Sequence, residues 1–250
     1  MLEKSEVIYR SIFMKNIGPI SLEEQEKLSK SNVAIIGCGG IGGRAFELLV
    51  RSGIGNITII DKDVYEPSNL NRQAFSSYEF IGIPKVNIAK KFALSINPTI
   101  NVNAVCSEFN EKNAVQLLKG KDVVIDGLDS ALPRIILSRK ARELRIPYVF
   151  GAAEKTRGIS TVFMPNSQNS RMYEEIFRLP SKGKRLDKKL KERLEALQRC
   201  ESVLGVVPNL IGTFEAMQTL NLLLNKPIVK SPYFFHVDMF SKVPVWIGKL

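Results

Sequence analysis

Short apolar runs alternate with longer amphipathic stretches over the first part of the chain. Residues 33–36 form a run of four apolar residues, which predicts a short strand buried on both faces. A glycine-rich turn follows at residues 37–42, and residues 41–51 then carry apolar side chains at helical spacing. The Gly-Ile-Gly sequence at residues 53–55 ends that helix, and residues 57–61 predict a second strand. The pattern therefore predicts a β-turn-α-β unit.

The same alternation continues as far as residue 151. We predict helices at residues 85–95, 112–118 and 133–144, and strands at residues 101–105, 122–126 and 148–151. Strands that alternate with helices favour a parallel, doubly wound sheet, because each right-handed crossover returns the chain to the same sheet.

The pattern changes on both sides of this region. Before it, the capping box at Ser21 and Glu24 predicts a short helix that runs to about Ser29. After it, we predict a strand at residues 159–164, a polar and basic stretch at 171–197, an amphipathic helix at 210–224 and strands at 233–240 and 243–247. The expected fold class is α/β, a Rossmann-like, doubly wound and mostly parallel sheet extended by C-terminal antiparallel strands.

Composition agrees with an ordinary globular protein, since hydrophobic residues make up 44% and charged residues 24% of the chain. No apolar run approaches the roughly 18 residues that span a bilayer, and the first residues lack an apolar signal core, so we expect a cytoplasmic protein. The three cysteines contain no Cys-x-x-Cys pair, which argues against a disulfide framework and excludes a four-thiolate zinc site within one chain. We expect Cys38 and Cys106 to be packing residues and the single histidine, His236, to be packed or to lie in an edge strand.

The formal net charge of +11 raises the question of nucleic acid. Much of the excess lies in residues 182–193, which carry seven Lys and Arg side chains and no aromatic residue. Without aromatic side chains this segment lacks the stacking surface of a single-strand binder, so we do not expect a nucleic-acid partner. Two interpretations stay open: a solvated helix or loop, and a patch that attracts an acidic protein or substrate.

The glycine turn carries the first functional signal. Gly37, Gly39 and Gly42 match G-x-G-x-x-G directly after a predicted strand and at the start of a predicted helix, and Gly40 lies between them. Such a turn lets the backbone approach a phosphate, which then faces helix N-terminal amides. Asp61 ends the next predicted strand, where a carboxylate can accept a hydrogen bond from a ribose hydroxyl. The spacing predicts a bound nucleotide.

The fingerprint alone would suggest NAD, but the residues that follow favour a triphosphate. Arg72 and Lys85 are placed to converge near the phosphate end of a nucleotide, and a triphosphate needs cations there. Asp126 and Asp129 follow the predicted strand 122–126 at its carboxyl end, where ligands bind in open α/β sheets. A carboxylate there suits Mg²⁺ that bridges phosphates.

Together these motifs resemble those of the MoeB/ThiF/HesA family, which is related to the ubiquitin-activating enzymes. The resemblance covers roughly residues 9–248 and is most specific at N-L-x-R-Q and G-x-P-K. The matching segments are residues 16–18, 24–28, 37–43, 53–56, 61–63, 69–73, 82–85, 96–98, 126–129, 151–153 and 205–212. It implies a single ThiF-type adenylation domain over residues 1–250, with a helical N-terminal segment to about 31, a nucleotide-binding core to about 151, and a crossover loop and protein-substrate half beyond.

The resemblance also implies roles for individual residues. Asp61 would hold the ribose, whereas Asn69, Arg72 and Lys85 would hold the phosphates of ATP and Asp129 would hold Mg²⁺. A carboxylate is already a nucleophile at neutral pH, so its attack on the α-phosphate needs neutralised charge and in-line placement rather than a general base. This chemistry suits a chain with one histidine and no Ser-His-Asp pattern.

Three departures from the family pattern matter. The paired Cys-x-x-Cys zinc ligands that the family often carries are absent, so no structural zinc is predicted. The family's N-terminal arginine, which reaches the ATP of a neighbouring subunit, could correspond to Arg10 or Lys15. Cys200 lies near the position of the family's crossover-loop cysteine and is either an acceptor of the activated acyl group or an inert thiol.

The expected function is ATP-dependent adenylation, with release of pyrophosphate, of the C-terminal carboxylate of a small β-grasp protein of the ubiquitin-like or sulfur-carrier type. The expected assembly is a homodimer. The alternatives are an NAD(P)-dependent oxidoreductase, a ThiF-type enzyme that adenylates a peptide or tRNA, and a binding module without catalysis.

Overall fold

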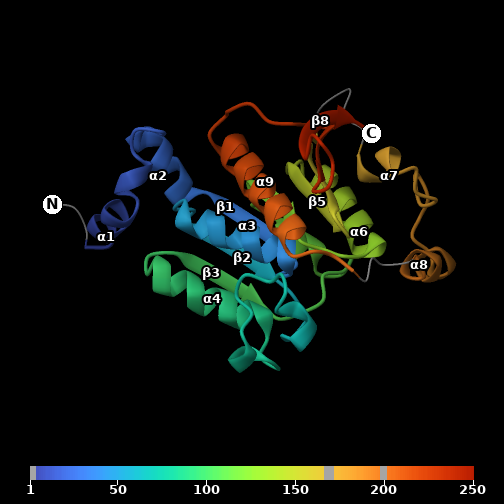
Figure 1. Ribbon diagram of the computed structural model, residues 1–250, viewed down its shortest axis with the longest axis horizontal. Coiled ribbons are helices and arrows are strands. Elements are labelled where there is room, and N and C mark those ends of the chain that lie inside the picture. Colours follow the sequence, from blue (N-terminus) through green and yellow to red (C-terminus); the bar gives the residue numbers. More distant parts are fainter. Residues whose placement is uncertain (1–3, 166–171, 198–201) are drawn as a thin grey trace.

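The computed structural model describes residues 4–165, 172–197 and 202–250. Its strands are β1 (Asn32–Ile36), β2 (Asn56–Ile60), β3 (Asn101–Val105), β4 (Val123–Asp126), β5 (Tyr148–Glu154), β6 (Arg157–Phe163), β7 (Tyr233–Asp238) and β8 (Val245–Lys249). They form one sheet in the order β3-β2-β1-β4-β5-β6-β7-β8 (Figure 1). Strands β1 to β5 pair in parallel, and β5 to β8 pair in antiparallel fashion. The predicted fold class is confirmed.

Helices cover both faces of this sheet (Figure 1). Their bounds are α1 (Lys4–Ile12), α2 (Leu22–Lys30), α3 (Gly40–Arg51), α4 (Lys85–Ile96), α5 (Ala114–Leu118), α6 (Ala131–Glu143), α7 (Tyr173–Ile176), α8 (Lys188–Glu195) and α9 (Val206–Leu223), with short 3₁₀ helices η1 (Met14–Asn16), η2 (Pro67–Asn69) and η3 (Tyr78–Phe80). Side chains of α3, α4 and α9 form the core on one face, and those of α5 to α8 form the core on the other.

The burial of the strands explains their sequences. Strands β1, β2 and β4 lie inside the sheet with helices on both faces, and all residues of β4 are buried. A strand covered on both sides has no solvent face, so it reads as a continuous apolar run rather than an alternating one. These strands were therefore visible in the sequence within a residue of their observed bounds.

Some boundaries differ from the prediction, and one residue lies in an unexpected environment. Helix α9 begins at Val206, one turn before the predicted residue 210, because Pro208 falls in the first turn, where a missing N–H costs no hydrogen bond. Strand β5 continues to Glu154, and β6 begins at Arg157, because these ends pair with each other around a tight turn. Cys106 directly follows the end of β3 at Val105 and is exposed, so the expectation that it is a packing residue is wrong.

The N-terminal capping box and part of the basic segment are ordered as helices. The Ser21 side chain accepts from the backbone N–H of Glu24, and Glu24 accepts from the backbone of Ser21, as predicted. Asp187 caps α8, whose Leu194 is buried against the α5–α8 core, so at least this part of the basic segment is a packed helix. Among the described residues, no helix combines the length and apolar character that a bilayer crossing requires.

Candidate active site

The sheet has a topological switch point between β1 and β4. From β1 the chain moves to β2 and β3 on one side, and it later returns to β4 and β5 on the other side. In open α/β sheets, ligands bind beyond the carboxyl ends of the strands at such a point. The glycine turn follows β1, and the loop that carries Asp129 follows β4. The switch point therefore lies between the predicted phosphate-binding turn and the predicted Mg²⁺ ligand.

Glycine backbones pack the turn directly onto the Asp129 loop. Gly37 has a φ of +99°, and a Cβ there would lie 2.4 Å from the carbonyl oxygen of Gly127. A Cβ on Gly42 would lie 2.1 Å from the carbonyl oxygen of Gly37. Both distances are impossible for a side chain, so these positions require glycine for close backbone packing.

Gly39 and Gly40 have different surroundings. A Cβ on Gly39 would find its nearest atom 4.0 Å away, whereas one on Gly40 would meet Cγ of Arg72 at 3.2 Å and Cβ of Pro208 at 3.1 Å. Gly39 is the N-cap of α3, and no side chain among the described residues caps that helix. An uncapped helix N-terminus beside an open glycine is a suitable anion site.

Asp61 is bound to the glycine turn from the end of β2. Its Oδ2 accepts from the Cys38 N–H at 2.6 Å, and its Oδ1 accepts from the Asp63 N–H at 2.8 Å. Burial raises the pKa of Asp61, while these two hydrogen bonds oppose that rise. Cys38 is buried, as predicted, and burial together with the charge of Asp61 raises its pKa, so this thiol stays protonated.

Lys85 begins α4 close to this carboxylate. The residue is only 5% exposed, and its Nζ lies 3.4 Å from Oδ2 of Asp63. Its backbone N–H donates to the Asp63 carbonyl oxygen, which fixes the start of α4 against the loop after β2. Lys85 and Asp61 therefore lie at the same end of the sheet.

Arg72 and Asn69 lie on the loop that includes η2. The stem of Arg72 packs beside Gly40, and its Nη1 donates to the carbonyl oxygen of Ser68 and to Oδ1 of Asn71, both at 2.8 Å. Asn69 is buried, and its Oδ1 accepts from the Glu66 N–H at 3.1 Å. Asn69 thus shapes the loop in this structure, while Arg72 lies across the start of α3.

Asp126 and Asp129 have different environments. Asp126 is fully buried and accepts from the Tyr148 hydroxyl and the Leu128 N–H, and it pairs with Nε of Arg134 at 3.3 Å. Arg134 also donates to carbonyl oxygens of Leu128 and Gly151. Burial alone would lower the pKa of Arg134, but the attraction of Asp126 together with the contributions of Tyr173 and Tyr148 raises that pKa. Asp126 and Arg134 therefore hold the loop on which the exposed Asp129 is carried.

Three other residues singled out in the sequence are Arg10, Cys200 and His236. Arg10 lies on α1 and pairs with Glu6 at 2.8 Å and with Glu26 at 3.3 Å. Cys200 lies outside the described residues. His236 is in β7, where its ring stacks on Trp246 at 5.1 Å, as a packed strand histidine would.

Several polar residues that the sequence analysis passed over are prominent in the structure. Asn71 and Asn209 bond to Arg72, and Glu215 is fully buried on α9. Burial and the charge of Asp126 raise the pKa of Glu215 well above its ordinary value. The signal that could have found two of them was the presence of Asn209 and Glu215 within the predominantly apolar helix at 206–223.

These features define a class: a doubly wound α/β protein with a nucleotide-type glycine turn at its switch point and cations beside it. The family model described as the ThiF family matches residues 13–244. The chain belongs to the ThiF family.

Curated relatives of the chain are named adenylyltransferases. A probable molybdopterin-synthase adenylyltransferase of Porphyra purpurea is 34% identical, over 85% of this chain and 53% of its own length. The sulfur carrier protein adenylyltransferase of Thermus thermophilus is 30% identical, over 99% of this chain and 87% of its own length. The chain thus spans about half the length of the first of these relatives.

Solved structures share the fold. E. coli MccB with ATP superposes with a TM-score of 0.73 at 21% sequence identity, covering 91% of this chain and 65% of that one. At this identity the likeness supports the fold alone.

Proposed function

We propose that this protein adenylates the C-terminal carboxylate of a small β-grasp carrier protein, with ATP as the donor and pyrophosphate as the leaving group. The observation that carries the proposal is the convergence at one switch point of the open, uncapped α3 N-terminus and the cations Arg72 and Lys85. The names of the relatives, adenylyltransferases for molybdopterin synthase and for a sulfur carrier protein, support the same reaction and substrate class.

The chemistry needs charge neutralisation more than proton transfer. The carrier's carboxylate is ionised at neutral pH and attacks the α-phosphate without a base, so one oxygen–phosphorus bond forms as the bond to pyrophosphate breaks. The α3 amides, Lys85 and Arg72 would hold the phosphates and the departing pyrophosphate. Asp61 would hold the ribose and, through the Cys38 N–H, would fix the glycine turn beneath it.

Mg²⁺ would be held by Asp129 together with the phosphates of ATP. In the part of the chain that the structure describes, no group of three or more His, Cys, Asp or Glu side chains lies close enough to hold a metal by itself. A single exposed carboxylate fits this ion, because Mg²⁺ in nucleotide sites takes one or two carboxylates and completes its shell with phosphates and water. The ion would neutralise charge on the phosphates.

The carrier would dock on the antiparallel half of the sheet. The hairpin of β7 and β8 exposes apolar side chains that a folded protein normally covers: Phe240 is 79%, Val243 59% and Ile247 56% exposed. The hairpin also lies at the edge of the sheet, where β8 is the outer strand (Figure 1). We further propose a homodimer in which Arg10 or Lys15 acts on the ATP of the neighbouring subunit.

The test is ATP–pyrophosphate exchange with each candidate carrier from the same genome. We expect exchange that depends on ATP, on Mg²⁺ and on one carrier with a free C-terminus. Exchange stimulated by no carrier contradicts the proposal, and so does a nicotinamide dinucleotide that binds more tightly than ATP in a calorimetric titration. Tighter binding of the dinucleotide would indicate an oxidoreductase instead.

A further inference from the structure

Two asparagines from distant parts of the chain meet at Arg72. Asn71 Oδ1 accepts from Nη1 of Arg72 at 2.8 Å, and Asn71 Nδ2 donates to the carbonyl oxygen of Val203 at 3.3 Å. Asn209 Nδ2 donates to the carbonyl oxygen of Arg72 at 3.0 Å and to that of Gly205 at 2.7 Å. Arg72 is thus connected at both its guanidinium and its backbone to the segment 203–205.

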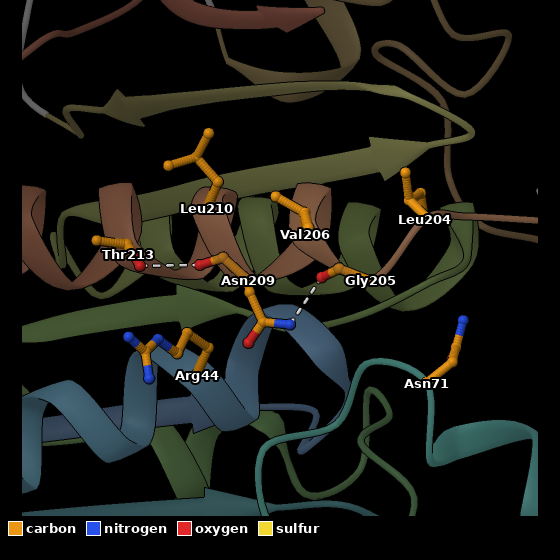
Figure 2. Close-up of a pocket in the computed structure, with 8 residues that line it drawn as sticks. All are labelled: Arg44, Asn71, Leu204, Gly205, Val206, Asn209, Leu210 and Thr213. Carbon is orange, nitrogen blue, oxygen red and sulfur yellow. Dashed lines mark hydrogen bonds between the residues drawn. The ribbon is translucent and has the colours of Figure 1, made fainter. Parts of the chain in front are cut away.

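The groove around these asparagines lies between α3 and α9, and Figure 2 shows Asn209 reaching from α9 toward Gly205. Close backbone packing holds the two segments together. A Cβ on Gly205 would lie only 2.1 Å from the carbonyl oxygen of Asn71, so glycine lets the start of α9 touch the Arg72 loop.

The segment 203–205 is also fixed from its other side. The Lys155 N–H donates to the carbonyl oxygen of Ser202, and the Leu204 N–H donates to that of Lys155, both at 2.9 Å. Lys155 is in the turn between β5 and β6, which belongs to the antiparallel half of the sheet. Through Asn71 and Asn209, Arg72 is therefore connected to the half of the molecule that does not contain the glycine turn.

We propose that Asn71 and Asn209 form an asparagine latch that positions Arg72 for the phosphates of ATP. The inference rests on the proposed function, because it assigns a purpose to the orientation of a phosphate-binding cation. Arg72 is partly exposed on a loop, and a long side chain there samples many rotamers unless its backbone and guanidinium are both held. The latch removes that freedom before ATP binds, which is preorganisation.

The experiment is a double-mutant cycle on ATP affinity, measured by calorimetry without a carrier. We expect Arg72→Ala to weaken ATP binding about 10-fold to 100-fold, since it removes charge-assisted hydrogen bonds. Asn209→Ala should weaken it about fivefold in the wild-type background and hardly at all in the Arg72→Ala background. Asn71→Ala, at an exposed loop position, should behave in the same way.

The matched control is Asn221→Ala on the same helix. Asn221 Nδ2 donates to the carbonyl oxygen of Pro227 at 2.8 Å, so this variant loses the same kind of hydrogen bond far from Arg72. We expect it to lower the melting temperature, as Asn209→Ala does, and to leave ATP affinity unchanged. Asn71→Asp adds a second discrimination: its carboxylate would compete with the phosphates for Arg72 and should weaken ATP binding more than Asn71→Ala.

Equal effects of Asn209→Ala in the wild-type and Arg72→Ala backgrounds would overturn the latch, because the asparagine would then act independently of Arg72. An unchanged ATP affinity in both asparagine variants would overturn it as well. Neither outcome depends on a carrier, so failure of the latch is distinguishable from failure of the adenylation proposal, which is tested by carrier-dependent exchange.

Discussion

The two halves of the sheet differ in burial and in the kind of ligand that each suits. In the parallel half, β1 and β4 are buried, and the turns at their carboxyl ends pack glycine against glycine. In the antiparallel half, β8 is the outer strand and leaves Val245, Trp246 and Ile247 between 40% and 56% exposed. The first half brings an uncapped helix N-terminus and cations together and suits a small anion, whereas the second leaves apolar surface that suits a macromolecule.

The largest expected effect is a loss of pyrophosphate exchange in variants of the parallel half. Lys85→Ala and Arg72→Ala should each lower pyrophosphate exchange about 100-fold to 1,000-fold, because they remove charge stabilisation at the leaving phosphates. Carrier affinity, measured in the absence of ATP, should stay the same. Lys90→Ala, on the exposed side of α4, is the matched control and should keep full exchange. Full activity in both site variants would contradict their placement at the phosphates.

The glycines separate packing from ligand approach within the same half. Gly42→Ala should destabilise the protein by roughly 1–3 kcal/mol, because its Cβ would lie 2.1 Å from the Gly37 carbonyl oxygen. Gly39→Ala should keep the melting temperature, because the nearest atom is 4.0 Å away, but should weaken ATP binding about tenfold by occupying the approach side. Thermal unfolding measures the melting temperature of both variants, and calorimetry measures their ATP affinity. A destabilised Gly39→Ala with normal ATP affinity would be inconsistent with an open phosphate site.

The antiparallel half should respond in the opposite way. Ile247→Asp should leave ATP affinity unchanged and should raise the KM for the carrier about tenfold or more, because it puts a charge into an apolar interface. Trp246 is the only tryptophan of the chain, so its fluorescence can report carrier binding directly. Glu79→Asp, at an exposed position of η3, serves as a conservative control. An unchanged KM would place the carrier elsewhere.

Glu215 lies where the two halves of the sheet meet. Its carboxyl lies against Gly151 of β5, and burial first and the charge of Asp126 second raise its pKa. The unfolded chain releases this proton at about pH 4.3 while the folded chain retains it, so stability falls as pH rises from there to the folded pKa. Relative to Glu215→Gln, which cannot ionise, the native protein should lose about 1.4 kcal/mol per pH unit in that window. Urea unfolding at several pH values measures the slope; parallel curves would contradict a raised pKa.

The smallest expected effect concerns the basic segment. Lys188→Gln combined with Lys189→Gln on α8 should weaken carrier binding by about threefold at low salt and not at high salt, as expected for exposed charges. If carrier affinity is unchanged at every salt concentration, the basic residues of α8 do not contact the carrier and only face solvent.

Much of the parallel half could be predicted from the sequence, because its strands and its site residues leave local patterns in the chain. Strand β4 and its loop were found because a strand covered on both faces must be apolar and a turn at its end needs glycine or a functional group. Asp61, Arg72 and Lys85 were found because each follows the glycine turn at a spacing that suits a group of the bound nucleotide. Their convergence at one end of the sheet follows from parallel topology alone.

The rest depended on contacts between distant segments. The pairing of Asn209 with Arg72 joins residues that no periodicity relates, and the structural use of Asn69 and Asp126 became visible only from their partners. Pro208 hid the first turn of α9, because proline breaks a helix interior and is tolerated only in the first turn, where it lies here.

Transfer of label from ATP radiolabelled at the α-phosphate to the carrier tests carboxylate adenylation directly. We predict that the carrier with a free C-terminus acquires the label as an acid-stable adenylate while the same carrier with an amidated C-terminus acquires none. Equal labelling of the two forms, or labelling of neither by an enzyme that binds ATP, would contradict carboxylate adenylation.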